Sequence, residues 1–390
     1  MSAPPARAPL AGLAVVELAG IGPAPFAGMI LADLGADVLR IDRPGSSRYP
    51  GRPRHDLVNR GKRSAALDLK QPAGAAAVRA LAVRADVLLE GFRPGVAERL
   101  GVGPAQCLGA NPKLVYGRVT GWGRDGPLAR TAGHDLTYLA ASGILHGIGS
   151  AGGAPVPPAN LLGDYGGGGM LLVAGVLSAL WRAHRTGTGD VVDAAIVDGA
   201  ALLATQLYGL RQDGLWHDQR GANLLDGGAP FYSVYETADG RHLAVGPLEP
   251  EFFAEFLARA GLDPEQVPAQ YDTSRWPRLR GLLARRLASR TRDEWVRIFA
   301  DSDACVAPVL TPVEAAAHPQ LAARQVFVDA HGVRQPAPAP RFATAPERGT
   351  GLPPPYPGEH TRQALADWGV SGVEELIDAG VAMQSQDHDD

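Results

Sequence analysis

The N-terminal part of the chain alternates short apolar runs with a longer segment of helical period. Residues 14–18 are apolar except for Glu17 and include two valines, which is typical of a buried strand. Pro23 opens a segment whose apolar residues recur at helical spacing to residue 34, and residues 37–41 form a second short apolar run. Because parallel strands need a crossover connection, the pattern predicts a β-α-β unit in a parallel sheet.

The same alternation continues through the first half of the chain. Strands are predicted at residues 65–69, 87–90 and 114–120. Helices are predicted at residues 74–84, 136–144, 169–185 and 191–214. Strands that alternate with helices are typical of an α/β domain, so the first half is predicted to form one.

The second half has a different pattern. Residues 232–235 and 243–245 are predicted to be the strands of a hairpin with Asp239 and Gly240 at its turn. Amphipathic helices are predicted at residues 251–260, 278–289 and 292–299, and proline-rich connectors at residues 335–340 and 352–357. A smaller α+β unit is therefore expected to begin near the hairpin.

Length and composition are those of a folded globular protein. At about 150 residues per domain, 390 residues correspond to two or three domains. With 45% hydrophobic residues, 20% charged residues and a net charge of -4, the chain is neither a disordered chain nor a strongly basic nucleic-acid binder. We therefore expect no nucleic-acid partner.

The cysteines and the apolar runs bear on the compartment. Cys107 and Cys305 are too few and too far apart in the sequence for a disulfide framework or a cysteine zinc site, so we expect a reducing compartment and no metal. The longest charge-free apolar run, near residues 170–181, falls short of the roughly 18 to 20 residues that a bilayer needs. Without a secretory leader either, a cytoplasmic protein with no membrane span is expected.

The opening unit imitates a dinucleotide-binding fingerprint. Gly20 and Gly22 follow the first strand, and Asp42 ends the next one. Pro25, however, stands where the third glycine of that fingerprint belongs, and arginines flank Asp42 on both sides, which favours a phosphate over a ribose hydroxyl. A nicotinamide dehydrogenase is therefore disfavoured.

Basic residues are concentrated just after this unit. The cluster comprises Arg40, Arg43, Arg48, Arg52, Arg54, Arg60, Lys62 and Arg63. Only Asp42 and Asp56 oppose it in that stretch, so a ligand with several phosphates would suit it. The alternative is a solvated, arginine-rich loop.

Three segments carry candidate catalytic side chains. His134 lies at the start of a predicted helix, where backbone N–H groups such as that of Asp135 favour developing negative charge. Asp164 precedes a glycine run that lets a ligand or another backbone approach, and it is either a catalytic carboxylate or the cap of the next helix. Glu249 stands between two prolines and is either an ordinary loop acid or a fixed partner.

Several motifs together resemble the family III CoA-transferase superfamily. The motifs shared with it extend over nearly the whole chain and are Val15-Val16-Glu17-Leu18, Ala32-Asp33-Leu34-Gly35-Ala36-Asp37-Val38, Arg43-Pro44, Leu67-Asp68-Leu69-Lys70, Gly91-Phe92-Arg93-Pro94-Gly95 and Gly163-Asp164. Those that resemble its α-methylacyl-CoA racemase branch are Gly133-His134-Asp135, Leu225-Asp226-Gly227-Gly228-Ala229-Pro230-Phe231-Tyr232 and Glu249-Pro250. Their joint occurrence makes the resemblance specific.

The resemblance implies a fold and an assembly. It implies the α/β class, with a large Rossmann-like domain built on a parallel sheet and a small α+β domain. Two such subunits would interlock as a homodimer and complete the active site together. On this plan residues 1–195 and 325–390 form a discontinuous large domain, residues 196–221 and 319–324 are linkers, and residues 222–318 form the small domain.

The resemblance also implies the ligand. The opening unit would hold an acyl-CoA substrate rather than a nicotinamide, and because CoA is part of that substrate no separate cofactor is expected. The residues that match the family's CoA-contacting positions are Arg43, Leu67, Asp68, Leu69, Lys70, Gly91, Phe92, Arg93, Arg99, Gly133, His134, Asp135, Leu136, Thr137 and Tyr138.

For catalysis the resemblance implies His134 and Asp164 as an acid/base pair, with Glu249 supporting the histidine. The implied reaction epimerises the 2-methyl centre of a branched acyl-CoA through an enolate. A proton must leave one face of that carbon and return to the other, so two titratable groups must flank it. A carboxylate can fix the imidazole tautomer, and the N–H of Asp135 can stabilise the enolate oxygen.

Two alternatives are weighed against this hypothesis. A CoA-transferase would use Asp164 as a nucleophile that forms an acyl anhydride, and a silent acyl-CoA-binding protein would need no proton-transfer groups. The presence of both His134 and Glu249 favours the racemase, because a carboxylate nucleophile needs no second base. The acyl chain, whose identity stays open, is expected in an apolar pocket lined by residues 21–26, Met29 and Met170.

Overall fold

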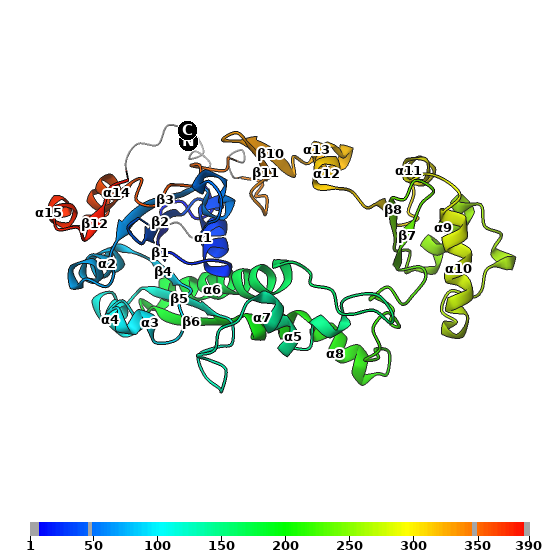
Figure 1. The fold of residues 1–390 in the computed structure, drawn as a ribbon, viewed down its shortest axis with the longest axis horizontal. Coiled ribbons are helices and arrows are strands. Elements are labelled where there is room, and N and C mark those ends of the chain that lie inside the picture. The colour runs from blue at the N-terminus through cyan, green and yellow to red at the C-terminus, as the bar shows by residue number, and fades with distance from the viewer. Residues whose placement is uncertain (1–7, 46–48, 345–348, 386–390) are drawn as a thin grey trace. The chain divides into compact units, whose positions relative to one another are not determined.

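The computed structural model describes residues 8–45, 49–344 and 349–385 (Figure 1). The chain divides into two compact units. The first comprises Met1–Ser142, Ala159–Leu203 and Ala323–Asp390, and the second comprises Gly143–Pro158 and Ala204–Ala322. The family-based domain boundaries stay a prediction. The expected linker at residues 196–221 contains two helices, of which α7 (Ile196–Leu203) belongs to the first unit.

A seven-stranded sheet forms the centre of the first unit, with the strand order β12-β3-β2-β1-β4-β5-β6. The strands are β1 (Ala14–Leu18), β2 (Asp37–Asp42), β3 (Lys62–Leu67), β4 (Val87–Glu90), β5 (Val115–Thr120), β6 (Asp190–Ala195) and β12 (Ala382–Met383). All pairings in it are parallel except that of β12 with β3. The order of β3 to β6 is that of a doubly wound sheet. The predicted α/β class with a large parallel sheet is therefore confirmed.

Helices cover both faces of this sheet. They are α1 (Pro23–Asp33), α2 (Pro72–Arg84), α3 (Val96–Arg99), α4 (Pro104–Ala110), α5 (Asp135–Ala141), α6 (Leu171–Thr186), α14 (Thr361–Asp367) and α15 (Val373–Asp378). Val16 of β1 packs in one core with Leu365 of α14. Val15 packs in the opposite core with Leu31 of α1 and Val176 of α6. Because successive strand residues face opposite sides and both sides are covered, β1 reads as a nearly continuous apolar run.

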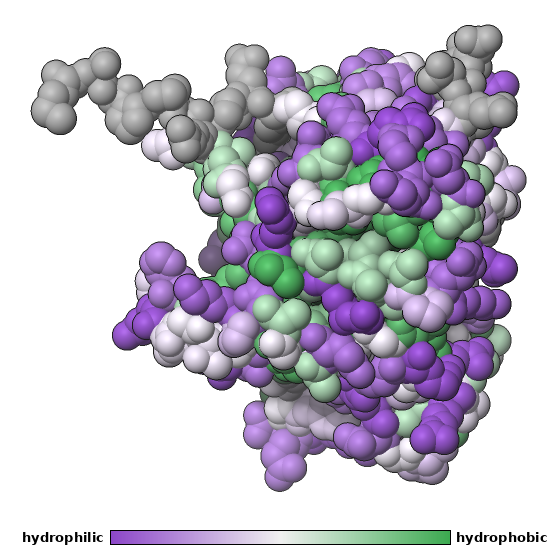
Figure 2. All heavy atoms as spheres, turned by 90° about the vertical axis from the view of Figure 1, so that its left-hand side faces the viewer, coloured by the Kyte–Doolittle hydropathy of each residue, from purple (hydrophilic) through white to green (hydrophobic). Residues whose placement is uncertain are grey.

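The C-terminal segment returns to the edge of the sheet. Ala382 of β12 pairs with Leu67 of β3, and the N–H of Gly358 donates to Ser64 Oγ at 2.8 Å. Figure 2 shows the side of the molecule on which α14 and α15 lie, where polar and charged side chains surround a strip of apolar ones. The unpaired edge of β3 is thereby covered, which protects it from pairing with another chain.

Some elements differ from the prediction. Residues 191–195 were expected to begin a helix but form β6, in which Val191 pairs with Tyr116 and Val192 with Gly117 of β5. Hydrophobic period alone does not separate a short buried strand from a buried helix. The antiparallel pair β10 (Phe327–Ala330) and β11 (Val333–Pro336) was not predicted, and it includes the start of an expected connector.

The helix expected to begin at residue 169 begins earlier, as the π-helix η4 (Leu161–Met170) that runs directly into α6. The N–H of Tyr165 donates to the carbonyl of Asn160, five residues earlier, at 3.3 Å. Asn160 is the N-cap, so the alternative that Asp164 caps this helix is wrong. π-helical segments often occur at functional sites.

The glycine run in η4 allows two other backbones to approach. A Cβ on Gly199 of α7 would lie 1.9 Å from the carbonyl oxygen of Gly167. A Cβ on Gly169 would lie 3.1 Å from the carbonyl oxygen of Pro23, the first residue of α1. The expectation that another backbone approaches this run closely is therefore confirmed, and the packing holds η4 against the starts of α1 and α7.

The continuous helix Leu161–Thr186 is long and apolar enough, by length and composition, to cross a membrane. The helix is longer than the charge-free run in the sequence because it continues through Asp164. Leu172 and Val176 of α6 are buried beside β5 and β6. The core helix of a folded α/β domain has this same composition, since it lies on an apolar sheet.

The second unit contains a small antiparallel sheet of β7 (Ser233–Glu236), β8 (His242–Val245) and β9 (Val306–Pro308). The predicted hairpin is confirmed, with Gly240 in the left-handed region (φ 71°) at its turn. The helices are α8 (Thr205–Gln212), α9 (Pro250–Ala260), α10 (Trp276–Leu287), α11 (Arg292–Phe299), α12 (Pro312–Ala317) and α13 (Pro319–Ala323), which ends at the unit boundary. Phe256 stacks on Phe299 at 5.5 Å in an aromatic core with buried Trp295.

Candidate active site

A cavity of about 700 Å³ lies in the first unit beyond the carboxyl ends of β1, β4 and β5. Its walls are the loops that follow these strands, together with His134 before α5 and Asp164 in η4. Ligands of open parallel sheets bind in the crevice at this end of the strands. The predicted acid/base pair therefore lines a cavity where the fold class places ligand sites.

His134 is held at the N-terminus of α5. Its backbone is extended (φ -138°, ψ 170°), and its N–H donates to Thr137 Oγ1 at 3.0 Å. The Thr137 hydroxyl in turn donates to the His134 carbonyl at 2.7 Å. This exchange closes the first turn and fixes the backbone from which the imidazole extends.

Asp164 is held by its neighbour in the fold, Asp135. The backbone N–H of Asp164 donates to Asp135 Oδ2 at 2.6 Å. Asp135 is buried, and its Oδ1 has no hydrogen-bond partner among the described residues. Burial, and next the charge of Asp135, raises the pKa of Asp164 to about 6, while His134 acts in the opposite direction. Asp164 can thus exchange a proton near neutral pH.

Gly22 makes room for this carboxylate. Its φ of 73° lies in the left-handed region, and a Cβ there would lie 3.1 Å from Asp164 Oδ2. The sequence pattern shows Gly22 only as part of a turn that imitates a dinucleotide site. No local signal relates it to Asp164, because the contact joins residues far apart in the chain.

Two further cavity residues, Thr120 and Trp122, were missed by the sequence analysis. Thr120 Oγ1 and Trp122 Nε1 are buried and lack hydrogen-bond partners among the described residues, and both side chains line the cavity. The Trp122 ring also meets the ring of Tyr138 edge-on, at 4.8 Å. Buried donors without a partner are rare, so these two are available to a ligand. Their position at the carboxyl end of the parallel strand β5 is the signal that identifies them.

A second cavity, of about 280 Å³, adjoins the first. Its lining includes Arg43, the four residues from Leu67 to Lys70, and Phe92. Phe92 and Val96 line both cavities, so the two share a wall after β4. The predicted CoA residues that line one or both cavities are Arg43, Leu67, Asp68, Leu69, Lys70, Gly91, Phe92, Arg93, Gly133, His134 and Tyr138.

Four other predicted CoA residues line neither cavity. The Thr137 hydroxyl donates to the His134 carbonyl at the first turn of α5, and the Asp135 carboxylate accepts the backbone N–H of Asp164. Leu136 is 43% exposed, and Arg99 is the last residue of α3. Their contact with CoA stays a prediction. Within the described ranges, no three His, Cys, Asp or Glu side chains are grouped so that they could hold a metal ion.

Glu249 belongs to the second unit. It is the N-cap of α9, where its carbonyl accepts the N–H of Phe253 at 3.0 Å. Burial is the largest cause that raises the pKa of Tyr271 and that of Cys305, and the charge of Glu249 is the second cause for both. Pro250 is favourable as the first helical residue, which accounts for the Glu-Pro pair. The support of His134 by Glu249 stays a prediction.

Five members of the basic cluster are paired with carboxylates. The pairs are Arg40 with Glu17 and Asp42, Arg54 with Glu359, Arg60 with Asp33, Lys62 with Glu17, and Arg63 with Asp37 and Asp367. Most of these partners lie far away in the sequence, so the fold neutralises much of the charge that the sequence window shows. Phosphate binding by these five residues stays a prediction, and Arg40 lines the second cavity. Arg43 also lines the second cavity, and Arg48 lies outside the described residues.

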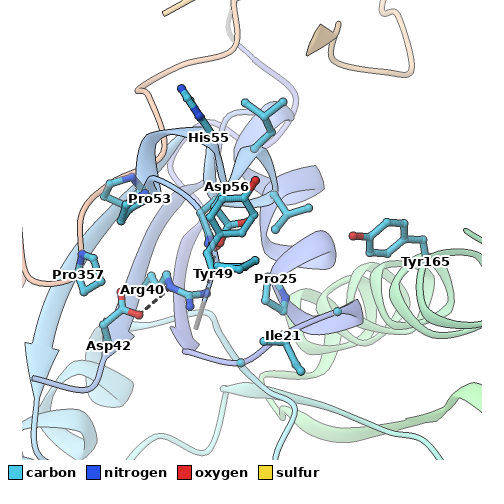
Figure 3. Close-up of a pocket in the computed structure, with 17 residues that line it drawn as sticks. Ile21, Pro25, Arg40, Asp42, Tyr49, Pro53, His55, Asp56, Tyr165 and Pro357 are labelled. Atoms are coloured by element: carbon cyan, nitrogen blue, oxygen red, sulfur yellow. Dashed lines mark hydrogen bonds and ion pairs between the residues drawn. The ribbon is translucent and has the colours of Figure 1, made fainter. Parts of the chain in front are cut away.

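A third cavity, of about 380 Å³, shares Ile21, Gly22 and Tyr165 with the first. Figure 3 shows Tyr165 at one end of this cavity and the ion pair of Arg40 and Asp42 at the other end. The loop expected to line an acyl pocket thus borders this space. Met29 is buried, Met170 is exposed, and neither lines any of these three cavities, so the expectation for the two methionines stays a prediction.

Known proteins resemble this chain over nearly its whole length. It is 45% identical over 368 residues to the mouse protein named alpha-methylacyl-CoA racemase. This match covers 94% of this chain and 95% of the mouse protein. The human protein of that name is also 45% identical, over 94% of each chain. The solved structure of a CaiB/BaiF family protein from Brucella suis superposes with a TM-score of 0.80 at 28% identity, covering 93% of this chain and 100% of that one. A family model described as CoA-transferase family III matches residues 10–361, and the chain therefore belongs to that family.

Proposed function

We propose that this chain is an α-methylacyl-CoA racemase, which interconverts the two configurations at the 2-methyl carbon of a branched acyl-CoA. The observation that carries the proposal is that His134 and Asp164 line one cavity and lie close enough for the histidine to lower the pKa of the carboxyl. Inversion of a carbon acid needs two proton-transfer groups around one carbon. The names of the mouse and human relatives support the same activity.

The CoA part of the substrate is proposed to occupy the second cavity, so that no separate cofactor is needed. Arg43 and Lys70 line that cavity and supply cations for phosphate groups. Phe92 borders both cavities, so a thioester that passes it would reach His134 and Asp164. Acyl-CoA is thus the proposed small-molecule partner.

Proton transfer is proposed to run in both directions through an enolate. With His134 neutral and Asp164 protonated, the imidazole takes the α-proton of one enantiomer and Asp164 returns a proton to the opposite face. With His134 protonated and Asp164 ionised, the same steps run in reverse. The N–H of Asp135, at the first turn of α5, is proposed to stabilise the enolate oxygen, as donors do in oxyanion holes.

Glu249 is proposed to fix the His134 tautomer in an interlocked homodimer, as the family resemblance implies. A carboxylate on one imidazole nitrogen keeps the other nitrogen ready to accept a proton. The cytoplasm is the proposed compartment, and the absence of a disulfide supports it, since both Cys107 and Cys305 are free thiols.

The alternative function is a family III CoA-transferase with Asp164 as nucleophile. The family model, which is that of CoA-transferases, favours this alternative. A transferase would form an anhydride on Asp164 and then a thioester with CoA. It gives no role to a histidine at the edge of the same cavity, so the racemase is the better account of His134.

The test is incubation of the purified protein with one enantiomer of a 2-methylacyl-CoA in D₂O, with a free carboxylic acid present. A racemase produces α-deuterated substrate of both configurations and no acyl-CoA from the added acid. Acyl-CoA of the added acid without deuterium uptake would establish the transferase. His134→Ala is expected to lower racemisation by about 100-fold or more, whereas His146→Ala, a histidine outside the three cavities, should leave racemisation unchanged.

A further inference from the structure

Glu90 is a buried carboxylate that the proposed proton transfers do not use. It is the last residue of β4, only 3% exposed, and lies opposite Arg118 in the register of β4 with β5. Its Oε2 accepts the backbone N–H of Phe92 at 2.6 Å. Its Oε1 lies 3.4 Å from Arg118 Nε. Buried acidic side chains are rare unless they are paired, and Glu90 has a backbone N–H and an arginine as its partners.

The residue that Glu90 holds belongs to the loop between two cavities. Phe92 lines both the catalytic cavity and the second cavity, while Gly91 and Arg93 line the catalytic one. The hydrogen bond from the Phe92 N–H therefore fixes the loop at the point where the two cavities share a wall. A bond to an ionised carboxylate is roughly twice as strong as one to a neutral acceptor.

Charged side chains from each neighbouring element surround Glu90. Arg118 and Arg124 both donate to Glu98 Oε1, at 3.2 and 3.1 Å, and Glu98 lies in α3. Asp193 of β6 and Tyr116 of β5 also interact electrostatically with Glu90. The cluster thus contains three acids, two arginines and one tyrosine, so the charge of Glu90 is set by the balance between them.

Glu90 changes its charge near neutral pH. Burial raises its pKa to about 7, and the charges of Glu98 and Asp193 add to this effect. The hydrogen bond from Phe92 and the charge of Arg124 oppose it. When Glu90 takes up a proton, Phe92 loses a charged acceptor. Arg118 Nε, which is buried and has no hydrogen bond among the described residues, then also loses the negative charge that lies 3.4 Å away.

We propose that Glu90 is a positioning residue for CoA binding, whose ionised carboxylate holds the loop from Gly91 to Arg93 in the conformation that receives the CoA part of the substrate. Affinity for CoA therefore falls when Glu90 becomes neutral. The inference rests on the proposed function in that it takes CoA as the ligand of the two cavities. Glu90 itself acts through the backbone of Phe92 and does not touch the reacting atoms.

The test is calorimetric titration of the full chain with CoA between pH 6 and pH 8.5. Wild type is expected to bind CoA more weakly as pH falls through about 7. Glu90→Gln keeps an acceptor for the Phe92 N–H without the charge, so at pH 8.5 its Kd should be about five- to tenfold higher. At pH 6 the two proteins should bind almost equally. Comparison at the same pH cancels the titration of the CoA phosphates and of Asp164.

Two further variants separate this role from general destabilisation. Asp33→Asn removes another buried, ion-paired carboxylate, which lines none of the three cavities, and should bind CoA as wild type does. Arg124→Gln removes a cation that favours ionised Glu90, so the loss of affinity should move to higher pH. This second variant keeps the test decisive should Glu90→Gln fail to fold.

Each outcome decides the role of Glu90. For an active racemase, the expected kinetic signature of Glu90→Gln is a raised KM for acyl-CoA with kcat nearly unchanged. Equal CoA affinity of wild type and Glu90→Gln at pH 8.5, or an unshifted pH midpoint in Arg124→Gln, would overturn the role while leaving the proposed function intact. A protein that binds no CoA at any pH would overturn both.

Discussion

Replacing Asp164 by asparagine is expected to abolish racemisation and to stabilise the fold at neutral pH. The pKa of this carboxyl in the folded protein, about 6, lies above its ordinary value of 3.8. The folded state therefore binds the proton more tightly than the unfolded chain does. Stability contributed by this proton is present below about pH 4 and is lost as pH rises through 6. Asparagine, which stays neutral, avoids that loss.

The magnitude follows from the size of the shift. A displacement of about two pKa units corresponds to about 3 kcal/mol at 1.36 kcal/mol per unit. Because the side chain lines an open cavity and is only half-buried, water screens part of this cost, and we expect about 1.5 kcal/mol. The advantage of Asp164→Asn over wild type should grow between pH 4 and pH 6 and stay constant above pH 6.

Urea unfolding of both proteins at pH 4.5, 6 and 8 measures this difference. Asp68→Asn is the matched control, because hydrogen bonds from the Lys70 N–H and the Gln71 side chain lower the pKa of Asp68. Stability that Asp68 contributes is fully present above about pH 4, so that variant should be less stable than wild type by the same amount at all three pH values. The reasoning would be refuted if Asp164→Asn were less stable than wild type at pH 8, or if the difference in stability between the two proteins did not depend on pH.

Two other substitutions probe the walls of the cavities. Gly22→Ala places a methyl group against Asp164 at a positive φ. The free energy of unfolding should therefore fall by about 1 to 2 kcal/mol, and deuterium exchange should become slower. Gly20→Ala is the control and should change neither, because no atom lies within 4 Å of its new methyl group. Thermal unfolding and exchange rates measure both, and unchanged exchange in Gly22→Ala would contradict the contact. Leu57→Trp fills the third cavity and should lower kcat/KM about tenfold for a long-chain 2-methylacyl-CoA but not for 2-methylbutanoyl-CoA. An equal effect on both substrates would exclude the third cavity as acyl space.

The elements of the opening unit could be predicted because each has a local cause. The valines of β1 are buried on both faces, and Pro23 stands at the first turn of α1, where its missing N–H costs nothing. β6 could not be predicted in the same way. Its valines pair with β5, and only that partner distinguishes a buried strand from a buried helix.

The candidate site was predictable in its residue types but not in its contacts. His134 and Asp164 were found from motifs, whereas the bond from the Asp164 N–H to the Asp135 carboxylate joins two helices and leaves no local pattern. The free charge of the basic cluster was not predictable for a similar reason. Arg60 has its counter-charge on Asp33, a residue of α1, so the charge of one sequence window did not describe the charge of the folded surface.

The π-helical hydrogen bonding of η4 makes the direction of the Asp164 side chain depend on the length of the segment. An α-helix turns about 100° per residue, and a π-helix holds one more residue within each hydrogen-bonded turn. Removing one glycine from the run would let the α pattern of α6 extend toward Leu161 and would rotate Asp164 away from Gly22. An insertion or deletion in this segment would therefore turn the carboxylate away from the cavity that it shares with His134.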